Sequence, residues 1–374
     1  MQAAVKSIVK HFHLEGTLPE VTPLAQGHIN DTYILTSEKN TRVVRHILQR
    51  INHAVFKDPP AMMANILRVT EHIYSKTQRI DPELASRQLR VICTDSGTGY
   101  YRDPEGSYWR VYNFVEQAVT CDAVESPELA YEAARMFGWF QNMLNDLPGP
   151  ALNETIPNFH NTRMRFDLFR EVLKKDPAGR AKDAKPEIDF ILGHADLCDV
   201  LPSAVRKGGF PSRIAHNDAK INNVMLDEHT HQGICVIDLD TVMPGLSVYD
   251  FADLVRTAAT HAREDERDLS KVRIEITMFA ALVRGFAEET HSFLMPAERN
   301  HLAFAGKVIT FEQCMRFLTD HLMGDVYYKI GRAGHNLDRC RTQMQLVKSI
   351  IEHEASMNEI VEKVFREHVS QQWT

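Results

Sequence analysis

A histidine, an aspartate and an asparagine stand close together in the segment His216-Asn217-Asp218-Ala219-Lys220-Ile221-Asn222-Asn223. An aspartate on a rigid loop can accept the proton of an attacking hydroxyl group and align that oxygen with a phosphorus atom. An asparagine five residues later can offer its amide oxygen to a magnesium ion on the same phosphates. The spacing H-x-D-x-x-x-x-N therefore predicts phosphoryl transfer, with Asp218 at the hydroxyl and Asn223 at the metal.

A second carboxylate follows on an extended support. Asp238 stands fifteen residues after Asn223, at the end of an apolar run. Residues 224–227 and 234–238 predict a hairpin, and residues 212–215 predict a strand just before the loop. Because carboxylate and amide oxygens suit a hard cation, Asp238 is predicted to be the second protein ligand of the metal.

The alternative for these positions is structural. His216, Asp218 and Asp238 would then be turn and cap residues without a joint role, which requires three positions and two strands to agree by accident. Asp240, two residues after Asp238, would point to the same side of an extended chain. It is either a further group around the metal or an anchor for the loop.

Strand signals concentrate in the first part of the chain. Residues 32–36 and 42–50 are rich in β-branched side chains and predict an antiparallel hairpin, and residues 89–93 and 108–115 predict further strands. Pro59-Pro60 opens a helical pattern of apolar residues, which predicts a helix after the hairpin.

Beyond residue 116 the pattern is mainly helical, apart from the hairpin that ends at Asp238. The sequence therefore predicts an α+β, bilobal fold. Residues 1–116 form a small β-rich N-terminal lobe for the nucleotide, and residues 117–374 form a large, mainly helical C-terminal lobe for catalysis and substrate binding.

Composition narrows the possible partners and location. The net charge of −7 argues against nucleic acid, since nucleic-acid binders usually carry a basic face. No segment approaches the roughly 18 apolar residues of a membrane span, and the N-terminus lacks the apolar core of a signal peptide. The six cysteines are scattered without a CxxC pair, so we expect reduced thiols and a cytoplasmic protein. Nothing indicates the oligomeric state.

The residues around Asp238 also carry a family resemblance. Ile237-Asp238-Leu239-Asp240, Gly245 and Tyr249-Asp250-Phe251-Ala252-Asp253-Leu254 resemble the aminoglycoside phosphotransferase and choline kinase family. The resemblance covers nearly the whole chain and implies a protein-kinase-like fold, ATP as phosphoryl donor and Mg²⁺ as cofactor. It also implies structural support of the catalytic loop by His216 and Asp250. The alternative for Asp250 is a helix N-cap before residues 251–258.

Several segments resemble the N-acetylhexosamine 1-kinases within this family, namely residues 27–33, 48–52, 214–218, 237–244 and 316–322. These enzymes phosphorylate the anomeric hydroxyl of N-acetylglucosamine or N-acetylgalactosamine, so the resemblance implies a sugar substrate. By the same resemblance the groups around the sugar are His28, Asp218, Arg316 and Tyr327.

Other interpretations remain open for this acceptor region. The acceptor can instead be an amino alcohol, methylthioribose or an aminoglycoside, and a silent nucleotide-binding scaffold is the interpretation from another class. Without the resemblance, His28 would be an ordinary turn residue. Arg316 would pair with Glu312, four residues earlier on the same predicted helix.

The nucleotide side departs from the protein-kinase pattern. The glycine-rich loop is reduced to Gly27, and no strand lysine is evident. Arg50 is the candidate for the α/β-phosphates, as an arginine serves in the choline kinase branch, with Glu71 as its candidate partner. The alternative for Arg50 is a surface arginine on an edge strand. Phe114 and Val115 lie where the lobes should join, so we expect their backbone groups to meet the adenine edge.

Overall fold

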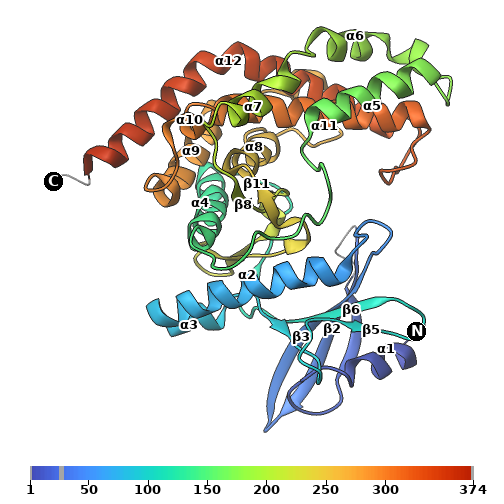
Figure 1. Cartoon of the computed structure of the whole chain (residues 1–374), viewed down its shortest axis with the longest axis vertical. Helices are drawn as coiled ribbons and strands as arrows, with labels where there is room; N and C mark the ends of the chain where they lie inside the picture. The colour runs from blue at the N-terminus through green and yellow to red at the C-terminus, as the bar shows by residue number, and fades with distance from the viewer. Residues whose placement is uncertain (1, 25–28, 372–374) are drawn as a thin grey trace.

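A β-sheet lobe and a helical lobe are stacked along the long axis of the protein (Figure 1), in a computed structural model that describes residues 2–24 and 29–371. This arrangement confirms the predicted α+β fold with a small β-rich N-terminal lobe and a large helical C-terminal lobe. The predicted boundary at residue 116 falls in the connection between strands β6 (Tyr108–Asn113) and β7 (Ala118–Val119).

The N-terminal sheet is antiparallel, with strand order β1-β2-β3-β6-β4 and β5 paired to β6. The predicted hairpin is present as β2 and β3, joined by Asn40 and Thr41 with φ of 47° and 66°. The strand bounds are β1 Glu20–Leu24, β2 Asp31–Lys39, β3 Arg42–Ile51, β4 Val91–Ile92 and β5 Tyr101–Arg102.

The two faces of this sheet pack against different helices. Leu48 and Trp109 lie on the face that is covered by α1 (Gln2–Val9). Ile51 of β3 and Tyr112 of β6 lie an odd number of residues from Leu48 and Trp109, so they point to the other face. There they join the main core that includes α2 (Pro59–Ile80). In Figure 1, α2 lies between the sheet and the helical lobe. Because successive side chains alternate between faces, parity along β3 and β6 decides which of them can reach the helical lobe.

Helix α2 begins where the sequence signals a start. The Asp58 side chain accepts a hydrogen bond from the Ala61 amide, and Pro59 and Pro60 occupy the first helical positions. These positions tolerate proline because their amides have no partner inside the helix. Apolar residues at helical spacing then cover the core-facing side, including Met63, Ile66 and Val69.

The C-terminal lobe is built around packed helices. Its larger helices are α4 (Pro127–Leu144), α5 (Thr162–Lys175), α8 (Ser247–Ala258), α9 (Ile276–Thr290), α11 (Leu302–Met323) and α12 (His335–Gln371). Its shorter helices are α6 (Lys185–Gly193), α7 (Leu197–Arg206) and α10 (Pro296–Arg299). The remaining short helix, α3 (Pro82–Ser86), follows α2 in the N-terminal lobe. None of the helices in the described chain is long and apolar enough to cross a membrane.

Helices α4 and α9 approach closely at Gly285. A Cβ atom at this position would lie 2.1 Å from the carbonyl oxygen of Tyr131, which is a backbone atom of the facing helix. We expect Gly285→Ala to lower the free energy of unfolding by about 1–3 kcal/mol, because the two helices must move apart. Gly193→Ala is the matched control, since a Cβ there meets nothing within 4 Å. Urea titration followed by circular dichroism measures both, and equal midpoints would contradict the prediction.

Two small sheets interrupt the helices and carry the loops at the centre of the molecule. Strands β9 (Val224–Asp227) and β10 (Gly233–Val236) form the predicted hairpin, and β7 adds to it. Strand β8 (Arg213–Ala215) pairs with β11 (Met243–Gly245). Both sheets end at residues 216–223 and 237–242, so these two segments lie side by side.

Candidate active site

The structure brings Asp218, Asn223 and Asp238 together at one end of the β9–β10 hairpin. Val224 pairs with Val236, and the next residue along, Ile237, donates its amide to the Asn223 carbonyl at 2.9 Å. The Asn223 Nδ2 donates to the Asp218 carbonyl at 2.9 Å. Since this bond commits Nδ2, the amide oxygen of Asn223 is the end that remains for a cation.

The catalytic loop is fixed from behind by Asp250. Its two carboxylate oxygens accept the backbone amides of His216 at 2.9 Å and Asn217 at 2.8 Å. Gln141 of α4 donates to the same carboxylate at 2.6 Å. Asp250 lies inside α8, which begins at Ser247, so the alternative of an N-cap before residues 251–258 is wrong. The side chain holds the loop, as the sequence interpretation required.

His216 links the two segments of the site. Its Nε2 lies 2.9 Å from the Ile237 carbonyl oxygen, directly before Asp238. The ring is buried and packs edge-on against Phe137 and Phe140 of α4. The aromatic side chains of α4 therefore support the site through this histidine, which is itself fully buried.

Lys220 is a member of the site that sequence reasoning missed. Its Nζ lies 2.8 Å from Oδ2 of Asp218. Burial pushes the pKa of Asp218 upward, but the charge and hydrogen bond of Lys220 and the charge of His216 outweigh burial and hold this pKa below its ordinary value. Asp218 is therefore ionised at neutral pH and can accept a hydroxyl proton. The signal was present in the sequence, two residues after Asp218.

Asp238 has the opposite electrostatic environment. Enclosure by surrounding protein atoms, followed by the charges of Asp240 and Asp218, raises the pKa of Asp238 to about 6. The residue has a left-handed backbone, with φ of 61°. Protein atoms surround its carboxyl group, yet the residue keeps solvent-accessible surface through which a cation can reach it. A carboxylate crowded by two others is a place where a cation would relieve repulsion.

A metal at this place would be held by few protein groups. Asn223 and Asp238 supply one amide oxygen and one carboxylate, a donor set that suits Mg²⁺ when phosphate and water oxygens complete the shell. Among residues 2–24 and 29–371, no three His, Cys, Asp or Glu side chains converge as a metal site of their own.

Asp240 is an anchor. Its Oδ1 pairs with the buried guanidinium of Arg110 from β6, and its Oδ2 accepts from Asn30 Nδ2 at 2.8 Å. The side chain is nearly fully buried, so both oxygens are already committed. Of the two roles considered for Asp240, the structure supports the anchor.

The structure does not bring Arg50 to these residues. Arg50 has the parity of Leu48, so it lies on the face of the sheet that α1 covers. There its Nε donates to Asp31 at 2.8 Å, and Asp31, not Glu71, is its ion-pair partner. Arg110 lies on the opposite face of the sheet, toward the helical lobe, where it pairs with Asp240. Gly27 and His28 lie outside the described residues.

The connection between the lobes forms an apolar floor beside the site. Val115 packs in a small cluster with Ile234 and Cys235, bordered by Met225 and Ile237. The Phe114 amide donates to the Arg45 carbonyl at 3.3 Å, so Phe114 offers no free N–H to a base. This floor lies next to the hairpin that carries Asp238, where a flat aromatic base would be covered on one side.

The predicted acceptor residue Arg316 lies on α11. Its guanidinium is 5.7 Å from the ring centroids of Phe159 and Tyr328, and its Nη1 donates to Gln313 at 3.1 Å. The alternative ion pair with Glu312 is not formed. Tyr327 is next to this group and 64% exposed.

Glu312 serves a different purpose. It contacts His160 Nδ1 at 3.2 Å and accepts from Thr162 at 2.6 Å. The Nε2 of the same histidine lies 3.1 Å from the Asn217 carbonyl oxygen, beside Asp218. The region of Arg316 and Glu312 and the loop of Asp218 are therefore joined through His160, which no sequence motif indicated.

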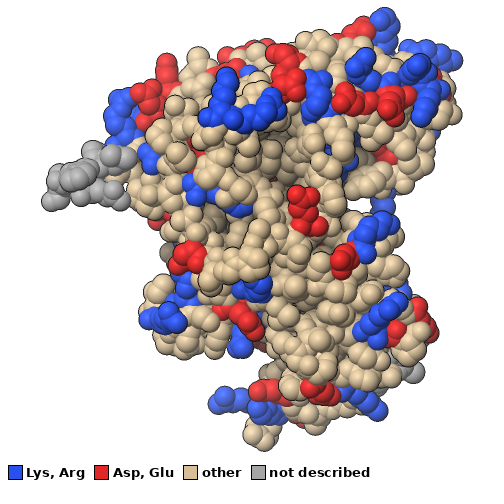
Figure 2. Space-filling view, in the orientation of Figure 1, with Lys and Arg blue, Asp and Glu red and all other residues tan. Residues whose placement is uncertain are grey.

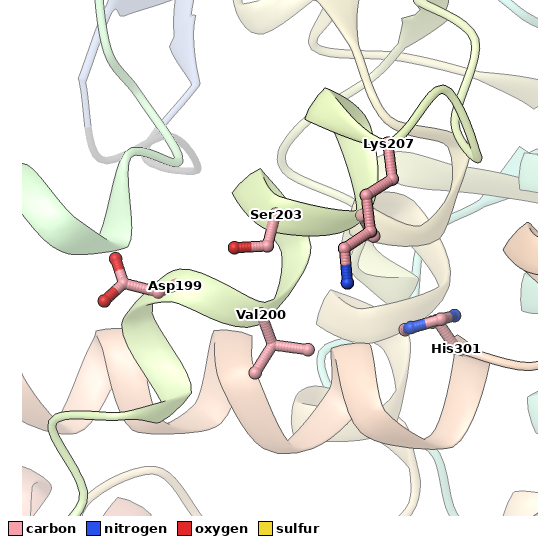
Figure 3. A pocket seen from close by; sticks show the side chains of 6 residues that line it. Asp199, Val200, Ser203, Lys207 and His301 are labelled. Atoms are coloured by element: carbon pink, nitrogen blue, oxygen red, sulfur yellow. The ribbon is translucent and has the colours of Figure 1, made fainter.

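A surface hollow of about 400 Å³ lies elsewhere, on α7 and the start of α11. Figure 3 shows its open lining of Asp199, Val200, Ser203, Lys207 and His301, with Ala204 completing it. None of the predicted site residues is among them. On the face seen in Figure 2, positive and negative side chains are interspersed over both lobes.

The β-sheet lobe and the helical lobe, which carries the loop of Asp218, form a protein-kinase-like fold. The sequence profile of the Phosphotransferase enzyme family matches residues 20–281, and the chain belongs to this family. Membership of this family makes the chain a phosphotransferase.

Three solved structures share the fold. An aminoglycoside phosphotransferase from Alicyclobacillus acidocaldarius is 16% identical, with a TM-score of 0.60 and 96% of each chain covered. Spectinomycin phosphotransferase, solved with ADP and spectinomycin, is 10% identical, with a TM-score of 0.57 over 94% of this chain and 98% of that one. Choline kinase from Cryptosporidium parvum is 14% identical, with a TM-score of 0.55 over 95% and 97%.

Proposed function

We propose that this protein transfers the γ-phosphoryl group of ATP to the anomeric hydroxyl of an N-acetylhexosamine, giving the sugar 1-phosphate and ADP. The observation that carries this choice of acceptor is the charge of the region around Arg316. Two arginines, Arg316 and Arg165, lie close enough that the charge of Arg316, after burial, lowers the pKa of Arg165.

Arg165 and Arg316 bring two positive charges to this region. Within the described chain neither Arg165 nor Arg316 forms an ion pair, and the buried Nε of Arg165 has no hydrogen-bond partner. Glu312 is the nearby carboxylate, and it is bonded to His160 and Thr162. Two guanidinium groups without a carboxylate partner of their own disfavour a cationic group of the acceptor, such as that of choline or an aminoglycoside, beside Arg316.

A neutral sugar suits the same groups. Guanidinium groups donate hydrogen bonds to hydroxyl and acetamido oxygens, and the aromatic rings of Phe159, Tyr327 and Tyr328 offer apolar faces to the sugar ring. We therefore propose that Arg316 donates hydrogen bonds to the sugar and that Tyr327 packs against its ring.

The proposed reaction is an in-line displacement. The sugar oxygen forms a bond to the γ-phosphorus, the bond from that phosphorus to the β–γ bridging oxygen breaks, and the hydroxyl proton passes to Asp218. An anomeric hydroxyl is more acidic than an ordinary alcohol, so the low pKa of Asp218 is sufficient and orientation is its main task. Mg²⁺ at Asn223 and Asp238 would neutralise charge on the phosphates.

Other residues position the nucleotide in this proposal. Lys220 places its ammonium beside Asp218, where the transferred group would approach. The apolar cluster of Val115 and Ile234 would cover the adenine, and the Val115 backbone would meet its edge.

An assay of ADP release across a panel of acceptors tests this function. N-acetylglucosamine and N-acetylgalactosamine are expected to support turnover, and choline, ethanolamine and spectinomycin are not. Phosphorus NMR of the product then reads the position of the phosphate. Turnover with a cationic acceptor and none with either sugar would overturn the proposal.

The raised pKa of Asp238 gives the site a pH dependence. Below about pH 6 this carboxyl is protonated and must lose its proton to bind Mg²⁺. We therefore expect the affinity for Mg²⁺–ADP to fall about tenfold per pH unit below 6 and to level off above 7. Nucleotide titrations from pH 5 to 8 measure this fall.

The nucleotide phosphate itself titrates near pH ~6, so the same titration of Asp238→Asn is the control. The variant retains only the slope that belongs to the nucleotide. Identical slopes in the two proteins would contradict the assignment of Asp238 to the metal.

A further inference from the structure

Arg110 of β6 reaches from the sheet lobe to the turn that follows Asp238. Its side chain is 1% exposed, and its Nη1 pairs with Asp240. Its Nε and Nη2 both donate to Gln49 Oε1, at 3.0 and 2.8 Å. The guanidinium is therefore fully engaged and covered on the face of the sheet that meets the helical lobe.

Asp240 gathers further groups from the sheet lobe. Asn30, just before β2, donates to its second oxygen at 2.8 Å. The side-chain oxygen of Asn30 in turn accepts the Asn52 amide, just after β3, at 2.9 Å. Two segments of the sheet lobe thus contact one carboxylate of the helical lobe, and a third segment holds Asn30 in place.

The turn that contains Asp240 is held from the other side by the catalytic loop. It is the 3₁₀ turn Leu239–Thr241, directly after Asp238. Thr241 donates to the His216 carbonyl at 2.7 Å, and Asn217 donates to the Thr241 carbonyl at 3.0 Å. The position of Asp238 therefore depends on contacts from both lobes.

We propose that Arg110 is a positioning residue for the metal: through Asp240 it sets the turn that carries Asp238, so the metal site is complete only when the sheet lobe is seated on the helical lobe. This inference rests on the proposed role of Asp238. Because Arg110 is covered by Asp240 and Gln49, it acts on the metal and not on the nucleotide.

The charges support this role. Arg110 lies within the field of Asp238 as well as Asp240, so it offsets the repulsion between these two carboxylates. Removing one member of a buried ion pair leaves the other charge uncompensated. Loss of Arg110 is therefore expected to shift the turn Leu239–Thr241, which contains Asp240, and to displace Asp238 from the metal.

The test compares ADP binding to the full chain in EDTA and across a range of Mg²⁺ concentrations. Arg110→Gln and Asp240→Asn are each expected to raise the Mg²⁺ concentration for half-maximal binding enhancement by about 10–100-fold, the size typical of groups that hold a metal ligand. The metal-free Kd for ADP is expected to change less than about twofold. The double variant is expected to lose less than the product of the two single losses, since both substitutions remove the Arg110–Asp240 ion pair.

Arg110→Lys keeps the positive charge but loses the planar set of guanidinium donors. Its Mg²⁺ concentration for half-maximal binding enhancement is expected to lie between those of wild type and Arg110→Gln. The lysine variant also keeps the test open if the glutamine variant does not fold. Arg102→Gln, an exposed arginine of β5 in the same sheet, is the matched control and is expected to leave the Mg²⁺ requirement unchanged.

An equal loss of ADP affinity in EDTA and in Mg²⁺ would overturn the proposal, because it would place Arg110 on the phosphates. An unchanged Mg²⁺ requirement in both Arg110→Lys and Asp240→Asn would overturn it as well. These titrations need no acceptor, so their outcome is independent of whether the sugar assignment holds.

Discussion

Replacing Asp218 by asparagine is expected to lower turnover by about 10²–10⁴-fold, while the Kd for ADP stays within about threefold of wild type. The asparagine keeps the size of the side chain and can still accept from Lys220. It loses the negative charge and cannot take the hydroxyl proton, so the acceptor is neither aligned nor deprotonated. Steady-state rates and a nucleotide titration on the same preparation measure the two effects separately.

Asp189→Asn is the matched control for this variant. Asp189 pairs with Lys185 on α6, as Asp218 pairs with Lys220, but both members of that pair are exposed at the surface. Its replacement is expected to leave turnover and ADP affinity unchanged, since surface pairs contribute little. Near-normal turnover of Asp218→Asn would remove Asp218 from the reaction and with it the proposed mechanism.

The central part of this site was predictable because its geometry is local. Asp218 and Asn223 lie on one loop, and five residues of separation suffice to join them through the Asn223 amide. Asp238 was predictable because a tight hairpin returns the chain to its starting point, with Val224 opposite Val236. In both cases short-range pattern determines which side chains meet.

Arg50 shows where the pattern fails. Both faces of β3 carry apolar residues, with Leu48 on one face and Ile47 and Ile51 on the other. The alternation of residues therefore did not indicate which face of the sheet the helical lobe covers. Arg50 was predicted to contact the nucleotide phosphates, but it lies on the face that α1 covers. Arg110 carried a better signal, because a charged residue inside the aromatic run Tyr108–Asn113 must have a buried partner.

Asp240 and His160 were beyond sequence reasoning for different reasons. The expectation for Asp240 assumed an extended chain, but the left-handed backbone at Asp238 and the 3₁₀ turn after it send the two side chains apart. His160 meets Glu312 across 152 residues and Asn217 across 57. Contacts at such separation are determined by how helices pack, which no local motif encodes.

Asp238→Asn is expected to raise the Mg²⁺ concentration required for half-maximal turnover by on the order of 100-fold or more, above the 10–100-fold typical of an outer-shell group. The asparagine retains an oxygen for the metal but lacks the charge that holds a divalent cation. ADP affinity in Mg²⁺ is expected to fall with it, and ADP affinity in EDTA is not. Rates and titrations at several Mg²⁺ concentrations measure these changes.

The stability of the same variant distinguishes a functional loss from unfolding. The folded protein holds the Asp238 proton with a pKa of about 6, above the ordinary 3.8 expected in the unfolded chain. Its contribution therefore favours the folded state below about pH 4 and is lost as pH rises through 6, where the ionised group faces Asp240 and Asp218. At pH 7.5 asparagine removes that repulsion, so the thermal midpoint is expected to stay equal or rise while turnover falls. A lowered midpoint would mean that Asp238 stabilises the fold, and a loss of activity would then not identify a metal ligand.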